Sequence, residues 1–464
     1  MCCSSKPAPG ATPRRRSRAK SWKPGSQKRA RRSATRQALR ASAKPPPAPP
    51  ASRDGRSRSS RLVGVSAPRS IATPQRLRPA ALATRHPGIA ATAGVFLAAL
   101  LAFLAIGAAL PVLPGYVRGP LRGSDLDVGI VVGAFAITAV ICRPLAGREA
   151  DRRGRRIVLV GGALAMALGG ALYLLAGSVA ALVGARLAVG VGEGAVYTAG
   201  ATWAVDLAPA DRRGLALGLF GLSVWGGLSL GPLAGELLRS AVGYDAVWAL
   251  TALLPAAGAL IALRLPEPLR PTAAGGQEAR RLVPRAAWRP GVALALANVG
   301  YAALAGFVVL HLRARGIDGG ATVFTAFALA VFASRLVLSR VPDRAGASPT
   351  ATAAGLLEAL GLLIVALATS LTVALVGAVV IGIGFSMLFP SLALMVVGGV
   401  GEDRRGSALG AFTAFFDIGV GLGGPLAGIT ASLGGYPAVF VLAAAGALCT
   451  AALAASGSRR GRLA

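Results

Sequence analysis

The sequence predicts an all-α membrane protein with twelve transmembrane helices in two six-helix bundles, preceded by a basic tail. Three observations support this fold class. Apolar residues make up 54% of the 464 residues, whereas charged residues make up only 15%. The apolar residues gather in segments close to the ~20 residues that a bilayer-spanning helix needs. The second half of the apolar region also repeats the first half.

The first 88 residues differ from the rest, because they hold 22 of the 50 Lys and Arg residues but only one acidic residue. Such a segment cannot bury a core, so we expect a disordered tail. Two interpretations stay open. The tail is translated upstream sequence with the true start near Leu62–Val65, or it acts in targeting or at an anionic membrane surface. Nucleic acid is not an expected partner, because only Trp22 could stack on a base.

Twelve apolar segments follow the tail. Backbone groups in lipid must be satisfied internally, so each segment is expected to be a helix. A polar, Pro-rich connection over 265–289 separates a bundle over 89–264 from a bundle over 290–456, and 457–464 forms a short tail. The expected spans are 90–113, 127–146, 157–177, 179–206, 214–238, 245–264, 290–312, 320–340, 350–369, 371–398, 405–431 and 436–456.

The distribution of arginine orients these helices. Twenty arginines lie in the connections and tail on the side of both termini, and five lie in the connections on the other side. Positive charge accumulates on the cytoplasmic side of membrane proteins, so both termini are expected in the cytoplasm.

A shift of 192 residues aligns the two halves. Six helices separate equivalent positions, so the repeats are parallel, as in two bundles that rock about a midplane cavity. The aligned pairs include Arg143 with Arg335, Asp151 with Asp343, Arg152 with Arg344, and, after a slip of one residue, Gly231–Gly235 with Gly424–Gly428.

Three motifs resemble those of the major facilitator superfamily, and the resemblance covers residues 90–456. It implies alternating-access transport in a bacterial inner membrane, by a protein that works as a monomer without a cofactor and uses the proton gradient. The third motif is associated with drug/proton antiporters, which implies efflux of a small organic molecule. The motifs are the inner-loop signature (Gly147, Asp151, Arg152, Gly154, Arg155, Arg156), the fourth-helix motif (Arg186, Gly190) and the fifth-helix motif (Gly227, Gly231, Pro232, Gly235).

The resemblance also implies roles for two of these motifs. Asp151 would latch the loop onto the start of the eleventh helix near Gly406–Ser407, with Arg152 holding its carboxylate. Positive-inside topology alone is the alternative. In the fifth-helix motif, Gly231 and Pro232 form either a bend that closes the cavity against proton leak or an ordinary close contact.

Charged residues within the spans are candidates for function, because a charge in the bilayer is costly unless it is paired. Glu193 and Arg186 share one helix face about 10 Å apart along the axis. Desolvation favours a protonated Glu193 and a nearby arginine favours the carboxylate, so movement between these surroundings would carry a proton. A static ion pair is the alternative. The remaining candidates are Glu236, placed near the outer interface, Arg335, Glu358, which belongs to no motif, and Asp417.

Asp417 is the second candidate proton carrier. It could bind a cationic substrate beside aromatic residues, or it could pair with Arg335 of the same half. Polar or aromatic candidates for the cavity wall are Asn298, Tyr301, Tyr197, Phe412 and Phe416. Asn298 and the two tyrosines could equally hold neighbouring helices together.

Enzymatic activity and a metal site are not expected. The sequence contains no Ser/His/Asp or Cys/His pairing, no metal-ligand spacing and no phosphate-binding loop. Two alternatives to proton-coupled efflux remain. One is a sugar or metabolite facilitator or symporter of the same fold, and the other is a membrane receptor or scaffold that does not transport.

Overall fold

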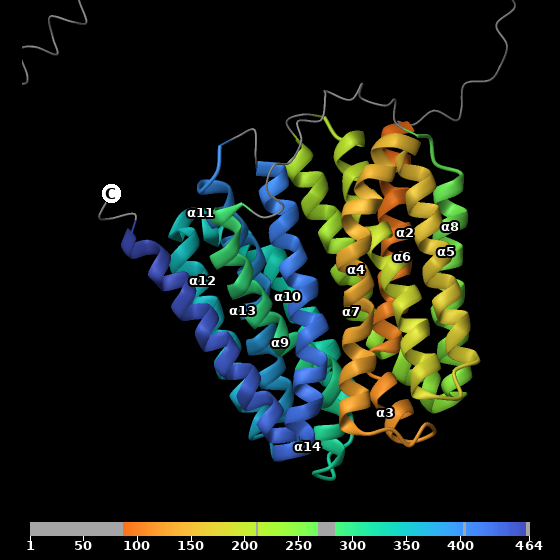
Figure 1. Ribbon diagram of the computed structural model, residues 1–464, viewed down its shortest axis with the longest axis vertical. Helices are drawn as coiled ribbons and strands as arrows, with labels where there is room; N and C mark the ends of the chain where they lie inside the picture. The colour runs from red at the N-terminus through yellow and green to blue at the C-terminus, as the bar shows by residue number, and fades with distance from the viewer. Residues whose placement is uncertain (1–86, 210–211, 268–283, 402–404, 461–464) are drawn as a thin grey trace, which may run out of the picture. The chain divides into compact units, whose positions relative to one another are not determined.

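The computed structural model describes residues 87–209, 212–267, 284–401 and 405–460. Nearly all of the expected tail and most of the connection over 265–289 lie outside these ranges. Helices dominate the described residues (Figure 1). They are α2 (Pro87–Ala109), α3 (Leu113–Arg118), α4 (Asp125–Arg153), α5 (Arg155–Leu174), α6 (Val179–Leu207), α7 (Arg213–Ala241), α8 (Tyr244–Leu263), α9 (Arg285–Arg313), α10 (Gly320–Leu338), α11 (Val341–Ala345), α12 (Ala347–Ala366), α13 (Leu371–Gly398) and α14 (Arg405–Arg460).

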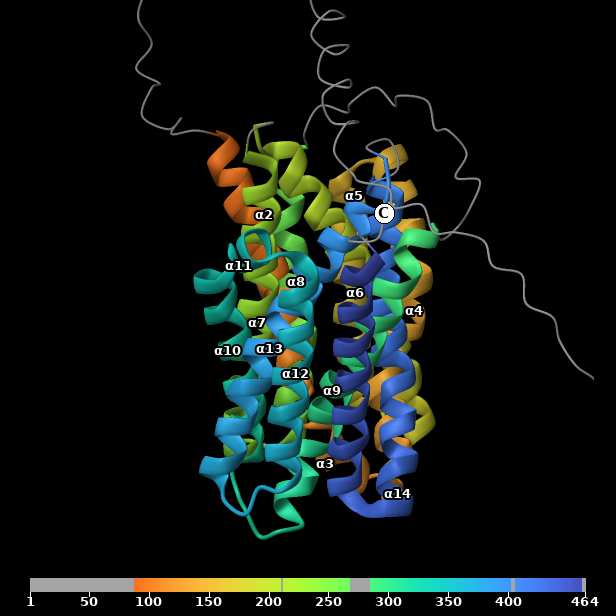
Figure 2. The ribbon, with the colours of Figure 1, turned by 90° about the vertical axis from the view of Figure 1, so that its left-hand side faces the viewer.

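The expected membrane crossings are present. Eleven helical stretches of the described residues are long and apolar enough to cross a membrane, and the last covers 49 residues over Ala408–Ser456. Gly435 interrupts this stretch with a φ of 74°. The chain reverses there, as the lower end of α14 in Figure 2 shows, so α14 supplies two crossings. With α14 divided in this way, the crossings number twelve, as predicted.

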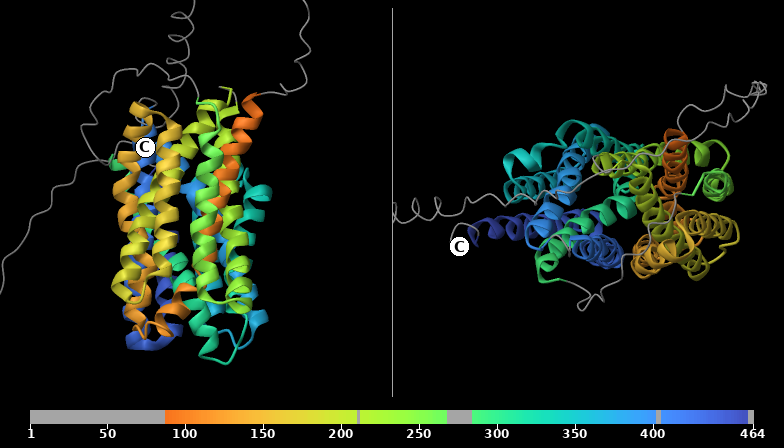
Figure 3. Two further views of the ribbon diagram at one scale, coloured as in Figure 1. Left: turned by 90° about the vertical axis from the view of Figure 1, so that its right-hand side faces the viewer. Right: turned by 90° about the horizontal axis from the view of Figure 1, so that it is seen from above.

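The helices α2–α8 and α9–α14 lie on opposite sides of the view along the helices (Figure 3, right). Within the first group α2 packs on α7 and α8, and within the second α9 packs on α14. The main contacts between the groups are those of α4 with α14 and of α7 with α10, and α3 and α4 also contact α9. The 192-residue shift relates α4 to α10 and α7 to α14, so each of the two main pairs is the repeat equivalent of the other. The bundles therefore meet in the way that a parallel repeat predicts.

We call the end near α3 and Gly435 the far end, and the end that carries Pro87 and Arg460 the terminal end. The bundles contact each other near the far end. A Cβ atom built on Gly424 of α14 would lie 2.3 Å from the Gly129 oxygen of α4. The two backbones are therefore in direct contact, which only glycine allows. Nearby, the Tyr436 hydroxyl donates to Asp125 Oδ1 at 3.1 Å. The bundles are closed against each other at this end.

The inner-loop signature is almost entirely helical, which differs from the expected loop. Helix α4 continues to Arg153 and α5 begins at Arg155, so Gly154 alone separates them, with a φ of 105°. Only glycine adopts this conformation without strain. Helix α9 likewise begins at Arg285, inside the expected connection over 265–289. Hydropathy locates the apolar part of a helix, and these helices continue beyond it as polar turns.

Candidate functional site

A cavity lies between the two bundles and encloses about 910 Å³ of empty space, open solvent included. Helices α2, α4, α6 and α7 line one side, and α9, α10, α13 and α14 line the other. The two sets are equivalent under the repeat. Four charged residues face the cavity, namely Arg143, Glu193, Arg335 and Asp417. The cavity therefore brings together the predicted Glu193 and Asp417 with two arginines.

Arg143 of α4 holds both carboxylates. Its Nη2 donates to Glu193 Oε1 at 3.0 Å and to Asp417 Oδ1 at 3.0 Å, and its Nε donates to Asp417 Oδ2 at 2.6 Å. The guanidinium carbon also lies 4.7 Å from the centre of the Tyr197 ring. Charge-assisted hydrogen bonds of this kind are stronger than neutral ones. Because Glu193 belongs to α6 and Asp417 to α14, the arginine connects the two bundles.

This cluster is shielded from solvent. Glu193 is 5% exposed and Asp417 2% exposed. A buried carboxylate needs a cation nearby, because desolvation of an unpaired charge is costly. Here two carboxylates share one guanidinium, so the ionised cluster has one excess negative charge.

Sequence reasoning did not select Arg143 as a site residue. A signal was available, because Arg143 and Arg335 are intramembrane arginines at equivalent positions of the two repeats. The same position in both copies is occupied by a residue that lipid disfavours.

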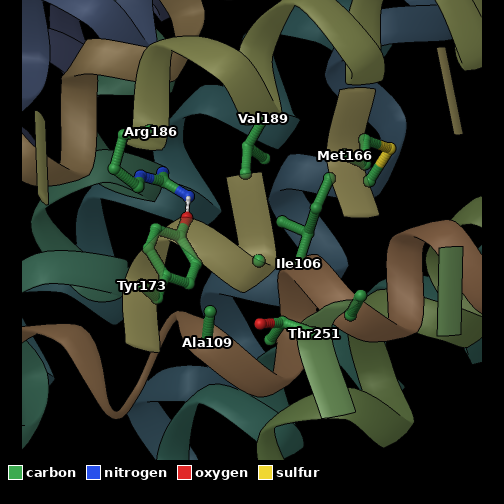
Figure 4. A pocket seen from close by; sticks show the side chains of 9 residues that line it. Ile106, Ala109, Met166, Tyr173, Arg186, Val189 and Thr251 are labelled. Carbon is green, nitrogen blue, oxygen red and sulfur yellow. Dashed lines mark hydrogen bonds between the residues drawn. The ribbon is translucent and has the colours of Figure 1, made fainter. Parts of the chain in front are cut away.

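The static ion pair of Arg186 with Glu193, the alternative to a proton-carrying Glu193, is wrong. Arg186 is fully buried, and its Nε and Nη2 donate to the carbonyl oxygens of Val131 at 2.9 Å and Val132 at 3.1 Å. Its Nη1 donates to the Tyr173 hydroxyl at 3.4 Å (Figure 4). Helical spacing placed the two charged residues on one face, but carbonyl acceptors of the neighbouring α4 lie closer. Arg186 fastens α6 to α4 within the first bundle.

Pairing of Asp417 with Arg335 of the same half is also wrong. Asp417 binds Arg143 of the opposite bundle, because α14 packs on α4. Helix α10 packs on α7 instead, and this places the Arg335 guanidinium carbon 5.3 Å from the centre of the Trp225 ring.

Three of the predicted cavity residues, Tyr197, Tyr301 and Phe416, line the cavity. Asn298 does not, since its Nδ2 donates to Leu294 O at 2.8 Å within its own helix. Phe412 is fully buried in a separate cluster, where its ring lies 5.3 Å from that of Phe389. Asn298 lies on the face of α9 that packs on Gly419 of α14, and Phe412 lies against Phe389 of α13. Trp225 and Phe385 line the cavity and were not predicted.

The inner-loop signature contacts its own bundle. The Asp151 side chain is 70% exposed and binds Arg155 Nη2 at 3.1 Å, so Arg155 takes the place expected for Arg152. Arg155 Nε also donates to Asp206 Oδ2 at 2.8 Å. The latch onto the helix start near Gly406–Ser407 stays a prediction, because the side chains at these positions lie outside the described residues. Asp343, the equivalent of Asp151, is exposed on α11.

The fifth-helix motif lies in α7 and faces α2. A Cβ atom on Gly235 would lie 2.1 Å from Ala108 O, and one on Gly231 would lie 2.6 Å from Ala108 N. A Cβ on Gly227 would meet Leu100 O at 2.6 Å. This geometry favours the close-packing interpretation of the motif, with Pro232 buried inside the helix.

Two further charged candidates lie away from the cavity. Glu236 forms an ion pair with Arg239 at 2.6 Å, at partly exposed positions near the far end. Glu358 of α12 is fully buried, and neither carboxyl oxygen has a hydrogen-bond partner among the described residues.

Comparison with known proteins identifies the family. The family model of the Major Facilitator Superfamily matches residues 95–322 and 293–460. The chain belongs to the major facilitator superfamily. It is 36% identical over 364 residues to the uncharacterized MFS-type transporter STM4428 of Salmonella typhimurium, covering 77% of this chain and 93% of the relative. It is 33% identical over 361 residues to the MFS-type transporter YhhS of Escherichia coli K12, covering 76% and 88%.

Solved structures show the same superfamily fold. The human organic anion transporter MFSD10 superposes with a TM-score of 0.61 at 21% identity, over 80% of this chain and all of that one. An inward-facing bacterial homologue of the lysosomal transporter Spinster superposes with a TM-score of 0.67 at 18% identity, over 81% and 98%. As a member of the superfamily, the protein is a multi-pass secondary transporter and not an enzyme.

Proposed function

We propose that the protein couples efflux of a small organic molecule to proton entry, with Glu193 and Asp417 as the proton-binding groups. The supporting observation is that both buried carboxylates share Arg143. With both ionised, the cluster has an uncompensated negative charge in surroundings of low dielectric, which favours uptake of a proton. Because the two groups interact, the proton belongs to the cluster rather than to one residue.

Proton binding would act on the contact between the bundles. Asp417 lies on α14, whereas Arg143 and Glu193 lie on α4 and α6. A protonated Asp417 loses its charge, and the Arg143–Asp417 attraction across the bundles weakens. The proton therefore binds better to the conformation in which this contact is broken, and it shifts the equilibrium toward that conformation.

The structure with an intact contact is closed at the far end. If that end faces outward, as the arginine distribution predicts, solutes reach the cavity of this conformation from the cytoplasm. The resemblance of the α7 motif to that of antiporters supports the efflux direction.

Proton symport of a metabolite is a second candidate, and the same arginine favours it. Protonation of the carboxylates releases Arg143, which an acidic solute could then bind. Proton and solute would in that case bind together and move in the same direction.

Proton movement during solute flow separates the two candidates. Proteoliposomes that contain the full chain and a pH-sensitive dye would be loaded with cationic dyes, antibiotics, organic acids or sugars in turn, and then diluted. Outward solute flow acidifies the lumen under antiport and makes it alkaline under symport. Glu193→Gln and Asp417→Asn should abolish the pH change, whereas Arg239→Gln, a control outside the cavity, should preserve it. Solute flow without any pH change in the wild type would show that the coupling proposal is wrong.

A further inference from the structure

We infer that Arg335 is an anion-binding group of the cavity and that the transported molecule is an organic anion with a flat apolar body. This inference rests on the proposed function only in taking the cavity as the transport site. It identifies the substrate class, which the motifs leave open.

Arg335 lacks the counter-charge that Arg143 has. Its guanidinium lies against Trp225, and its Nε atom is shielded from solvent without a hydrogen-bond partner. Within the described part of the chain, Arg335 forms no ion pair with a carboxylate. Charged side chains buried in a membrane protein are normally paired. The missing partner of Arg335 is therefore expected to come from a bound molecule.

The internal repeat shows which partners Arg335 lacks. The 192-residue shift aligns Arg143 with Arg335, and it aligns the two partners of Arg143, Glu193 and Asp417, with Phe385 and Trp225. The contacts agree with this alignment, because Arg143 touches Asp417 and Arg335 touches Trp225. The repeat thus keeps the arginine, but an aromatic side chain replaces each carboxylate: Phe385 of the second half stands for Glu193, and Trp225 of the first half stands for Asp417. Neither aromatic side chain supplies a counter-charge, so Arg335 is left to bind the carboxylate of a solute.

The aromatic side chains beside Arg335 form a wall that fits a flat solute. The Trp225 and Phe385 ring centres are 5.6 Å apart, and Tyr301 stacks on Phe385 at 5.9 Å with an interplanar angle of 23°. Gly221 lies on the same face of the cavity, and a Cβ built there would come within 3.8 Å of Arg335 Nη1. Aromatic faces bind apolar rings, while a guanidinium donates two parallel hydrogen bonds to a carboxylate.

The pairing of the charged groups in the cavity agrees with an anionic solute. Two arginines and two carboxylates face the cavity, but Arg143 engages both carboxylates. Arg335 is therefore the charged group of the cavity that is left for a solute to bind. An interior-negative membrane potential also drives an anion outward, which is the direction of the proposed efflux.

Binding of radiolabelled 2-naphthoate to the purified full-length protein tests the anion site. Competitors are 2-naphthamide and 2-naphthylmethylammonium, which keep the ring and change the charge. We expect naphthoate to bind about tenfold more tightly than either competitor. Arg335→Gln should reduce this preference to less than about twofold, and Arg239→Gln, which removes a distant arginine, should leave it unchanged.

A second pair of variants leaves Arg335 in place. Phe385→Glu restores the carboxylate found in the first half, so Arg335 should pair internally and naphthoate binding should be lost. Phe385→Gln introduces a side chain of the same size as glutamate but without its charge, so this variant should retain the naphthoate preference. This pair decides the question even if Arg335→Gln does not fold, as judged by size-exclusion elution.

Equal binding of naphthoate and naphthamide to the wild type, absence of naphthoate binding, or retention of the preference in Phe385→Glu would each overturn the inference. Binding is measured without a proton gradient, so failure of proton coupling alone would leave these results unchanged. The anion site and the coupling proposal can therefore fail separately.

Discussion

Arg143 controls the electrostatics of the cavity, because it is the only cation that contacts Glu193 and Asp417 in the described residues. We expect Arg143→Gln to lower the free energy of unfolding by about 3–5 kcal/mol, since it leaves two carboxylates buried without a counter-charge. Adding Asp417→Asn should recover part of this loss. Thermal and denaturant unfolding in detergent would measure both effects, and a double variant as unstable as Arg143→Gln would contradict the assignment.

Glu358 shows the opposite situation, a buried carboxyl group without a partner. The 192-residue shift aligns it with Met166, an apolar side chain of similar length. We expect Glu358→Met to raise the free energy of unfolding by about 1–3 kcal/mol, because it removes an unsatisfied buried polar group. Glu358→Gln keeps a buried polar group and should gain much less. A lower unfolding midpoint for Glu358→Met would indicate that Glu358 has a partner in another conformation.

Between helices, glycine determines how closely the bundles approach. Gly424 of α14 touches the backbone of Gly129 on α4, whereas a Cβ on Gly410 of the same helix would meet nothing within 4 Å. We expect Gly424→Ala to open the far end, because the new methyl group separates α4 from α14, and Gly410→Ala to have no such effect. Glycines allow the same close approach of backbones between α4 and α14, across the bundles, and between α2 and α7, within the first bundle.

Labelling of a cysteine in the cavity measures this opening. Ile106 lines the cavity, and Ile106→Cys would be placed in a background without the four native cysteines. A membrane-impermeant maleimide added to whole cells should label it several times faster with Gly424→Ala than with Gly410→Ala. Equal rates would show that the glycine contact does not hold the far end closed.

The lengths of the helices were harder to predict than their number. Each apolar segment identified a crossing, because every helix that spans the bilayer needs an apolar stretch of about 20 residues. The polar turns of α4 up to Arg153 and of α9 from Arg285 have no such signature, since a helix in water keeps its backbone bonds without being apolar. The fifth-helix motif was identified, but its contact with α2 depends on a helix distant in the sequence.

For the protein as a whole, the arginine distribution predicts that the terminal end faces the cytoplasm. Gly177 at the far end and Gly214 at the start of α7 are a matched pair for labelling, because a Cβ at either would meet nothing within 4 Å. In whole cells, an impermeant maleimide should label Gly177→Cys and not Gly214→Cys. The reverse pattern would place both termini outside and would reverse the proposed direction of efflux.

The twelve crossings, the parallel repeat and the superfamily motifs could be read from the sequence, because each depends on the composition of one segment or on a fixed spacing. The partners of the charged residues could not. In a membrane bundle, residues that face lipid are as apolar as residues that face a neighbouring helix, so hydropathy does not mark the face that lines the cavity. Arg143 and Asp417 lie 274 positions apart. They meet only because α4 packs on α14, and that packing also leaves Arg335 beside Trp225 without a carboxylate.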